Sequence, residues 1–133
     1  MTDPRSPVSE IMSRHVVSVG EKLTLRSLAA VLAEVDVGVA LVMQRDESIG
    51  VVSERDVVRA LADDADPEEV WAADVAVDRI VYAEPHETVL DVVEQMSAQD
   101  VRHVVVVDHG TITGVVSARD VLPVLAAHAR AAG

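Results

Sequence analysis

Two copies of one short motif carry the side chains of this sequence that are best suited to bind a ligand. Residues 50–61 and residues 114–125 are identical at eight of twelve positions, and both follow the pattern Gly-Val-Val-Ser-x-Arg-Asp-Val. A strand-to-helix turn with free backbone N–H groups favours phosphate, and a carboxylate beside it can accept hydrogen bonds from both hydroxyls of a ribose. The serine and aspartate pairs are Ser53 with Asp56, and Ser117 with Asp120.

The same motif also has a purely structural interpretation. Gly-Val-Val is typical of a buried strand, and serine followed three residues later by an acid is typical of a helix start. In that capping box the serine accepts a backbone N–H, and the aspartate reaches back to the serine N–H. The glycine of each copy allows either a ligand or another stretch of backbone to approach closely. From the motif alone both interpretations remain open.

The elements around each motif repeat in the same order, strand, helix, strand, strand, helix. In the first copy, residues 16–19 are predicted to form a strand, and Thr24 is predicted to cap a helix with apolar residues spaced by three and four. The second copy has the same phase, so one structural unit is used twice. The final helix is predicted to start near Ala118 and to kink or break at Pro123.

The two copies resemble the signature of cystathionine-β-synthase (CBS) domains, Gly-apolar-apolar-Ser/Thr-x-x-Asp. The resemblance covers nearly the whole chain as a stand-alone tandem pair, often called a Bateman module. It implies an α/β (α+β) fold of two β-α-β-β-α repeats packed with pseudo-twofold symmetry. The expected boundaries are a disordered N-terminus at residues 1–7, a first CBS repeat at 8–62, an acidic linker at 63–71, a second CBS repeat at 72–128 and a C-terminal tail at 129–133.

The resemblance also implies a function. Such modules sense an adenosine-containing ligand, namely AMP, ADP, ATP or S-adenosylmethionine, in clefts between the repeats, and this one would signal in trans to an unknown protein partner. The aspartates would hold ribose, and the serines would hold ribose or phosphate. Because the chain has few aromatic residues, Val17 and Val81 would contact adenine. The candidate nucleotide-binding residues are Ser53, Arg55, Asp56, Ser117, Arg119, Asp120, Arg102, His103, Val17 and Val81.

Basic residues distinguish the two repeats. The second repeat has Arg102-His103 before its buried strand, where nucleotide-sensing CBS proteins contact phosphate, and the first has Gly38-Val39 there. A partly exposed strand entry that tolerates charge explains the pair equally well. The arginine before each motif aspartate either binds phosphate or pairs with a neighbouring acid.

The resemblance also implies a homodimer, because CBS pairs commonly form disc-shaped homodimers. The alternative function is that of a structural dimer with vestigial clefts and no nucleotide response. We expect no enzymatic activity, because the sequence has no Ser-His-Asp set, phosphate-loop lysine or zinc motif. No required cofactor is expected.

Composition limits the partners further. The chain of 133 residues has a formal net charge of −12 and no cysteine, so no nucleic-acid partner, disulfide or thiol metal site is expected. The sequence has no membrane-spanning run and no secretory leader, so a cytoplasmic location is expected. The acidic residues 63–69 lack the spacing of a calcium-binding EF-hand loop and are predicted to be a solvated linker rather than a metal site.

Overall fold

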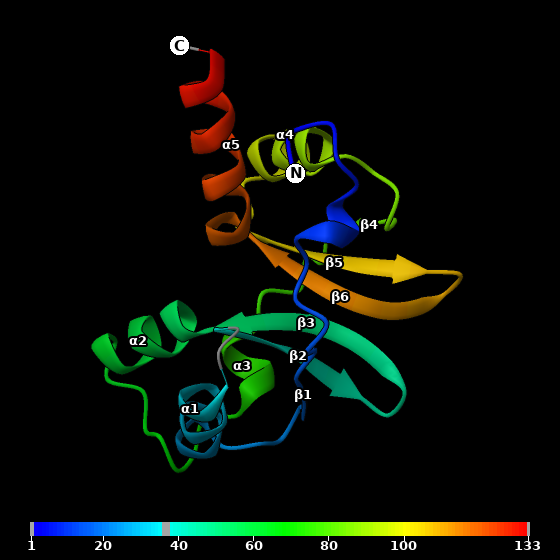
Figure 1. Ribbon diagram of the computed structural model, residues 1–133. Coiled ribbons are helices and arrows are strands. Elements are labelled where there is room, and N and C mark those ends of the chain that lie inside the picture. The colour runs from blue at the N-terminus through cyan, green and yellow to red at the C-terminus, as the bar shows by residue number, and fades with distance from the viewer. Residues whose placement is uncertain (1, 36–37, 133) are drawn as a thin grey trace. The chain divides into compact units, whose positions relative to one another are not determined.

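The computed structural model describes residues 2–35 and 38–132 and divides into two compact units (Figure 1). The central unit consists of Val16–Ile80, and the terminal unit consists of Met1–His15 together with Val81–Gly133. Each unit holds one copy of the motif. No helix in the described ranges has the length and apolar character needed to cross a membrane.

The central unit has the predicted order of elements. A three-stranded sheet has the order β1-β2-β3, with β1 parallel to β2 and β2 antiparallel to β3. Helices α1 and α2 cover one face of this sheet (Figure 1). The elements are β1 (Ser18–Gly20), α1 (Leu25–Glu34), β2 (Val39–Gln44), β3 (Glu47–Ser53), α2 (Glu54–Ala62) and α3 (Ala72–Val75).

The terminal unit repeats this arrangement. Its sheet has the order β4-β5-β6 with the same parallel and antiparallel pairings, and α4 and α5 lie on one face. The predicted β-α-β-β-α pattern is therefore confirmed in both copies. The elements are η1 (Val8–Glu10), a 3-10 helix, then β4 (Tyr82–Ala83), α4 (Val89–Gln99), β5 (His103–Asp108), β6 (Thr111–Ser117) and α5 (Ala118–Ala132).

Both cores are aliphatic, as the composition requires. In the central unit, the apolar stripe of α1 is formed by Leu25, Leu28 and Leu32, which are at most 3% exposed and pack with Val42 and Val52 of the sheet. The terminal unit buries the corresponding stripe of α4 against valines of β5 and β6. Burial of an apolar helix face against a sheet supplies most of the stabilisation in such a layer.

The two units exchange their leading segments. Residues 8–13 open the first repeat in sequence but pack in the terminal unit, where Val8 donates its N–H to the Glu87 carbonyl at 2.7 Å and Ser13 pairs with Val115. The equivalent residues 72–77 open the second repeat but pack in the central unit, where Val77 pairs with Val51. The compact units therefore differ in composition from the sequence segments 8–62 and 72–128.

The first residues of the chain also make defined contacts. Val89 donates its backbone N–H to the Ser6 carbonyl at 3.0 Å, and Leu90 donates to the Pro4 carbonyl at 2.9 Å. Residues 2–7, for which the sequence predicted disorder, thus accept the orphan N–H groups at the start of α4.

Pro123 does not break α5, which continues to Ala132, so an early break at this position was a wrong prediction. The proline removes the hydrogen bond to the Arg119 carbonyl. The helix continues because Val121 and Val124, on its inner face, are buried in the core of the terminal unit. Tertiary packing here outweighs one lost backbone bond.

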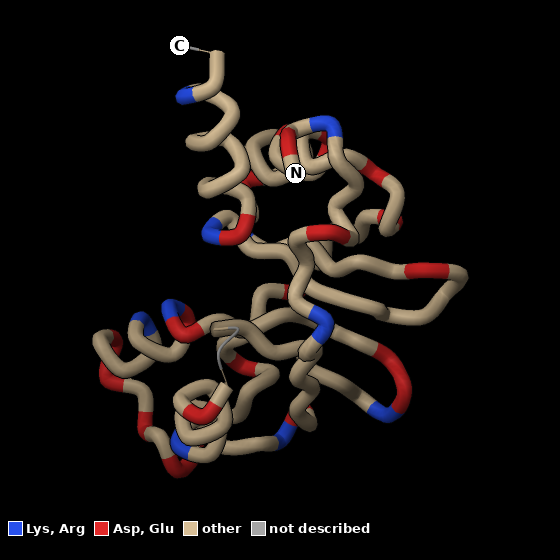
Figure 2. The backbone as a smooth tube through the Cα atoms, in the orientation of Figure 1, with Lys and Arg blue, Asp and Glu red and all other residues tan. Residues whose placement is uncertain are grey.

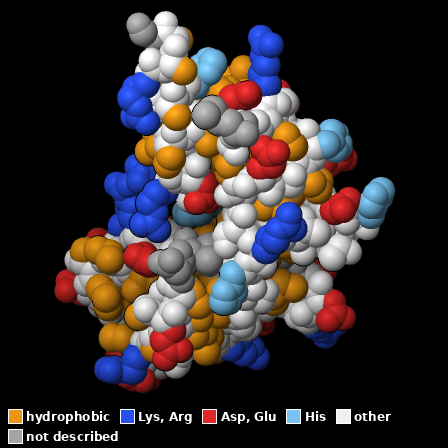
Figure 3. Space-filling model, viewed as in Figure 1, with side chains coloured by type: hydrophobic (Ala, Val, Ile, Leu, Met, Phe, Trp, Pro, Cys, Tyr) orange, Lys and Arg blue, Asp and Glu red, His pale blue; other side chains and the backbone are white. Residues whose placement is uncertain are grey.

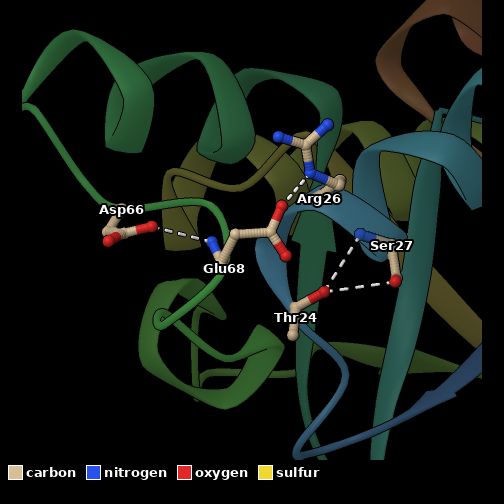
Figure 4. A network of polar contacts seen from close by, with 5 residues as sticks. All are labelled: Thr24, Arg26, Ser27, Asp66 and Glu68. Atoms are coloured by element: carbon tan, nitrogen blue, oxygen red, sulfur yellow. Dashed lines mark hydrogen bonds and ion pairs between the residues drawn. The ribbon is translucent and has the colours of Figure 1, made fainter.

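The acidic segment between α2 and α3 (Figure 2) is attached to the central unit by a small polar network. Figure 4 shows the Arg26 guanidinium against the Glu68 carboxylate. The backbone N–H of Arg26 also donates to the Pro67 carbonyl at 3.0 Å. The Lys22 ammonium lies 5.6 Å from the centre of the ring of Trp71, the last residue of the segment. These exposed contacts hold the segment beside α1 and contribute little free energy individually.

The motif glycines make room for the exchanged segments. A Cβ at Gly50 would lie 2.8 Å from the Val77 carbonyl oxygen, and a Cβ at Gly114 would lie 2.9 Å from the Ser13 carbonyl oxygen. Of the two possibilities that the sequence left open, the glycine of each copy therefore accommodates backbone.

Substituting Gly50→Ala should lower the free energy of unfolding by about 1–3 kcal/mol, because a backbone carbonyl cannot move away as a flexible side chain can. Urea denaturation measures the loss. Gly20→Ala is the matched control, since a Cβ there would meet no atom within 4 Å. Equal stability of the two variants would contradict the close approach.

Candidate functional site

The motif turn of the central unit lies where β3 ends and α2 begins. Ser53 is the N-cap of α2, and its hydroxyl accepts the Asp56 N–H at 3.3 Å. Oδ2 of Asp56 accepts hydrogen bonds from the Ser53 N–H at 2.8 Å and from the Ser53 hydroxyl at 3.0 Å. The predicted capping box is therefore present, and it uses one carboxylate oxygen.

The turn of the terminal unit has the same geometry. Oδ2 of Asp120 accepts from the Ser117 N–H at 2.8 Å and from the Ser117 hydroxyl at 3.1 Å, and the Asp120 N–H donates to that hydroxyl at 3.3 Å. Both aspartates are half-buried. Within the described ranges, no hydrogen bond reaches Oδ1 of either aspartate, so the capping box uses one oxygen of each carboxylate and not the other.

Strand register brings the residue before each buried strand to the motif turn. In the terminal unit, His103 pairs with Ser117, and the Ala118 N–H donates to the Arg102 carbonyl at 2.8 Å. In the central unit, Val39 pairs with Ser53 in the same way, and the Glu54 N–H donates to the Gly38 carbonyl at 3.0 Å. Arg102 and His103 are thus placed beside the Ser117–Asp120 turn.

The two valines predicted to contact adenine precede the parallel strands. The Val17 carbonyl accepts the Leu41 N–H at 2.8 Å, and the Val81 carbonyl accepts the Val105 N–H at 2.9 Å. Both valine side chains are half-buried and pack against the cores of their units. In each unit, the central strand of the sheet therefore lies between this valine and the motif strand.

Arginines add positive charge near both turns. Arg55, Arg119 and Arg102 are exposed, and none of them forms an ion pair with another described residue. Of the two possibilities for the motif arginines, pairing with a neighbouring acid is therefore not observed.

We call each arrangement a half-site. The central half-site consists of Val17, Gly38, Ser53, Glu54, Arg55 and Asp56, and the terminal half-site consists of Val81, Arg102, His103, Ser117, Ala118, Arg119 and Asp120. Each half-site offers a carboxylate oxygen for hydroxyl groups, a hydroxyl, and an unpaired arginine at the positive end of a helix. These groups suit a sugar phosphate and include no nucleophile–base pair.

Glu54 was not predicted as a site residue, although its carboxylate lies beside Gly38 in the central half-site. Its Oε1 lies 3.3 Å from the position that a Cβ on Gly38 would occupy. The sequence contained a signal for this residue, because Glu54 in one copy and Ala118 in the other occupy one of the four positions at which the two motif copies differ. Its meaning was hidden because only the fold places residue 38 beside residue 54.

An open hollow lies at the other end of β2 from the half-site. Its volume is about 470 Å³, and it contains none of the predicted binding residues. The residues that line it are Gly20, Glu21, Lys22, Met43, Gln44 and Arg45. Its mixed charge and open shape do not define a ligand site.

The fold and the paired turns define a tandem CBS module. The sequence pattern of the CBS domain matches residues 8–63 and 72–127, and the chain belongs to this family. A tandem CBS pair is a ligand-binding regulatory module, so the resemblance seen in the sequence is confirmed.

Individual relatives agree with this assignment. Hypoxic response protein 1 from Mycobacterium tuberculosis is 30% identical over 90% of this chain and 85% of its own length. A CBS domain protein from Pyrobaculum aerophilum, solved in complex with AMP, is 34% identical with a TM-score of 0.78, covering 93% of this chain and 98% of that one. A putative signal-transduction protein from Burkholderia ambifaria, 22% identical with a TM-score of 0.80 over 88% of this chain and 91% of that one, shares the fold.

One solved relative contains zinc ions. A solved structure of hypoxic response protein 1 has two coordinated zinc ions; it is 29% identical, with a TM-score of 0.69, over 90% of this chain and 99% of that one. The part of this chain that the structure describes holds no group of three or more His, Cys, Asp or Glu residues able to bind a metal ion. The sequence also has no cysteine.

Asp56→Ala and Asp120→Ala should each lower the free energy of unfolding by about 1 kcal/mol, because each removes a reciprocal capping box. Asp91→Ala should cost the same, since Asp91 and Thr88 form an equivalent box at α4, with both bonds at 3.0 Å. Chemical denaturation measures all three. A much larger loss for the motif aspartates would mean that they stabilise more than their own helix starts.

Proposed function

We propose that the protein is a regulatory module, not an enzyme, that senses an adenosine-containing nucleotide through its motif turns. Oδ1 of Asp56 and of Asp120 would accept ribose hydroxyls, while Oδ2 remains in the capping box. The serine hydroxyls and the helix N-terminal N–H groups would contact ribose or phosphate. The sensed ligand belongs to the group AMP, ADP, ATP and S-adenosylmethionine.

The observation that carries this proposal is the pairing of an available carboxylate oxygen with an unpaired arginine in one strand–helix turn, which occurs twice. Its chemistry matches a ribose next to a phosphate. The AMP complex of the Pyrobaculum aerophilum relative supports the same class of ligand. Binding would change the population of module conformations and thereby act in trans on a protein partner.

Adenosine nucleotides should raise the melting temperature of the purified protein, because a ligand that binds only the folded state stabilises it by mass action. At a ligand concentration near 100 times Kd, the stabilisation is about 2.7 kcal/mol. The measurement is differential scanning fluorimetry with AMP, ADP, ATP, S-adenosylmethionine and adenosine. Guanosine nucleotides serve as the chemical control.

Asp56→Ala and Asp120→Ala should reduce this ligand-induced shift, whereas Asp91→Ala should preserve it. The three variants lose equivalent capping boxes, so the comparison separates ligand contacts from general destabilisation. A shift that survives in both motif variants, or no shift with any adenosine ligand, would sink the sensing proposal.

We also propose that the module forms a homodimer through α2 and α5. Val58 of α2 is 64% exposed and Leu122, at the equivalent position of α5, is 61% exposed. Apolar side chains gather over α2 (Figure 3). Large exposed aliphatic side chains at repeat-related positions suit a second copy of the chain, because closed oligomers use the same surface on each copy. A CBS-CP12 protein from cyanobacteria, 24% identical, is hexameric.

The double variant Val58→Glu with Leu122→Glu should convert a dimer to a monomer in sedimentation velocity, because it buries like charges at the proposed interface. Val77→Glu is the control, because Val77 is another exposed valine, 44% exposed, and it lies outside α2 and α5. An unchanged sedimentation coefficient in the double variant would exclude this interface. A dimer without any nucleotide response would instead favour the structural alternative with vestigial clefts.

A further inference from the structure

We propose that the two half-sites select ligands by charge, so that the terminal half-site takes the phosphate of an adenosine nucleotide and the central half-site excludes it. This inference rests on the proposed function, because it assumes that the turns bind adenosine ligands. It goes further by predicting one phosphorylated ligand for each chain and by naming the residue that rejects a second.

Glu54 makes the central half-site unfavourable for phosphate. It is the first residue of α2, where an anion would otherwise meet the free N–H groups. Its carboxylate Oε1 lies 3.3 Å from the position of a Cβ on Gly38, which is the position from which the other repeat presents an arginine side chain. A carboxylate thus lies in the space where a phosphate would need a cation.

The terminal half-site has the opposite charge. Arg102 occupies the position of Gly38, and Ala118 occupies the position of Glu54. The Ala118 N–H bonds the Arg102 carbonyl at 2.8 Å, which places the arginine at the start of α5. Because Ala118 has no carboxylate, the start of α5 lacks the additional negative charge that Glu54 adds at the start of α2, and Asp120 is the acid of its first turn.

The difference between the half-sites amounts to two charges at equivalent places. The motif arginines, Arg55 and Arg119, are common to both and cancel in the comparison. Arg59 has no basic counterpart, since Pro123 holds the equivalent position, but it lies five residues beyond Glu54, about 7.5 Å further along α2. A phosphate therefore meets Arg102 in one half-site and Glu54 in the other.

Gly38 explains how the acid is accommodated. Its φ of +75° lies in the left-handed region, where glycine is favoured and a larger residue such as arginine would be strained. The central half-site therefore combines a glycine that cannot readily be replaced by a cation with a carboxylate that covers it. An uncharged nucleoside avoids this repulsion, whereas each added phosphate increases it.

Isothermal titration calorimetry with AMP and adenosine tests the assignment. The wild-type protein should bind one AMP per chain. Ala118→Glu should weaken AMP binding by about tenfold or more relative to Ala118→Gln, because the two side chains have similar size and differ in charge. Adenosine binding should change equally in the two variants. Glu54→Gln should strengthen binding of a second AMP in the central half-site.

The outcomes distinguish failure of charge selection from failure of nucleotide sensing. Equal AMP affinity of the Ala118→Glu and Ala118→Gln variants, or two AMP molecules bound per wild-type chain with equal affinity, would overturn charge selection while leaving nucleotide sensing intact. Failure of the wild-type protein to bind any adenosine ligand would overturn the proposed function together with this inference. Circular dichroism of each variant checks that it is folded.

Discussion

The candidate site depends on one repeated constraint, the reciprocal capping box that joins a sheet strand to a helix. In each unit a single carboxylate oxygen accepts both the N–H and the hydroxyl of the serine three residues earlier. This arrangement fixes where the motif strand ends and the direction in which the helix leaves. The second carboxylate oxygen takes no part in the capping box.

The motif glycine supports this constraint from the other side of the strand. At Gly50 the space that a side chain would fill is taken by the Val77 carbonyl, and at Gly114 it is taken by the Met12 side chain and the Ser13 carbonyl. Each compact unit is thus completed by the opening segment of the other repeat. The central unit, Val16–Ile80, is continuous in sequence, whereas the terminal unit joins residues from both ends of the chain.

Duplication supplies the symmetry of the module, and a few substitutions break it. The two turns keep the same hydrogen bonds within 0.1 Å, so the geometry of serine and aspartate is shared. One difference lies at the residue before the buried strand, Gly38 or Arg102, and another lies at the first residue of the helix, Glu54 or Ala118. These positions meet across the turn, so changes in sequence at two places act on one local electrostatic environment.

The sequence by itself determined the repeat, the order of elements, the helix caps and the family, because these depend on local spacing and on apolar periodicity. Tertiary structure decided that the motif glycines face backbone, that α5 passes through Pro123, and that Glu54 lies beside Gly38. Each of these depends on contacts between residues distant in the chain. Spacing along a sequence carries no information about such contacts, so no local pattern could have revealed them.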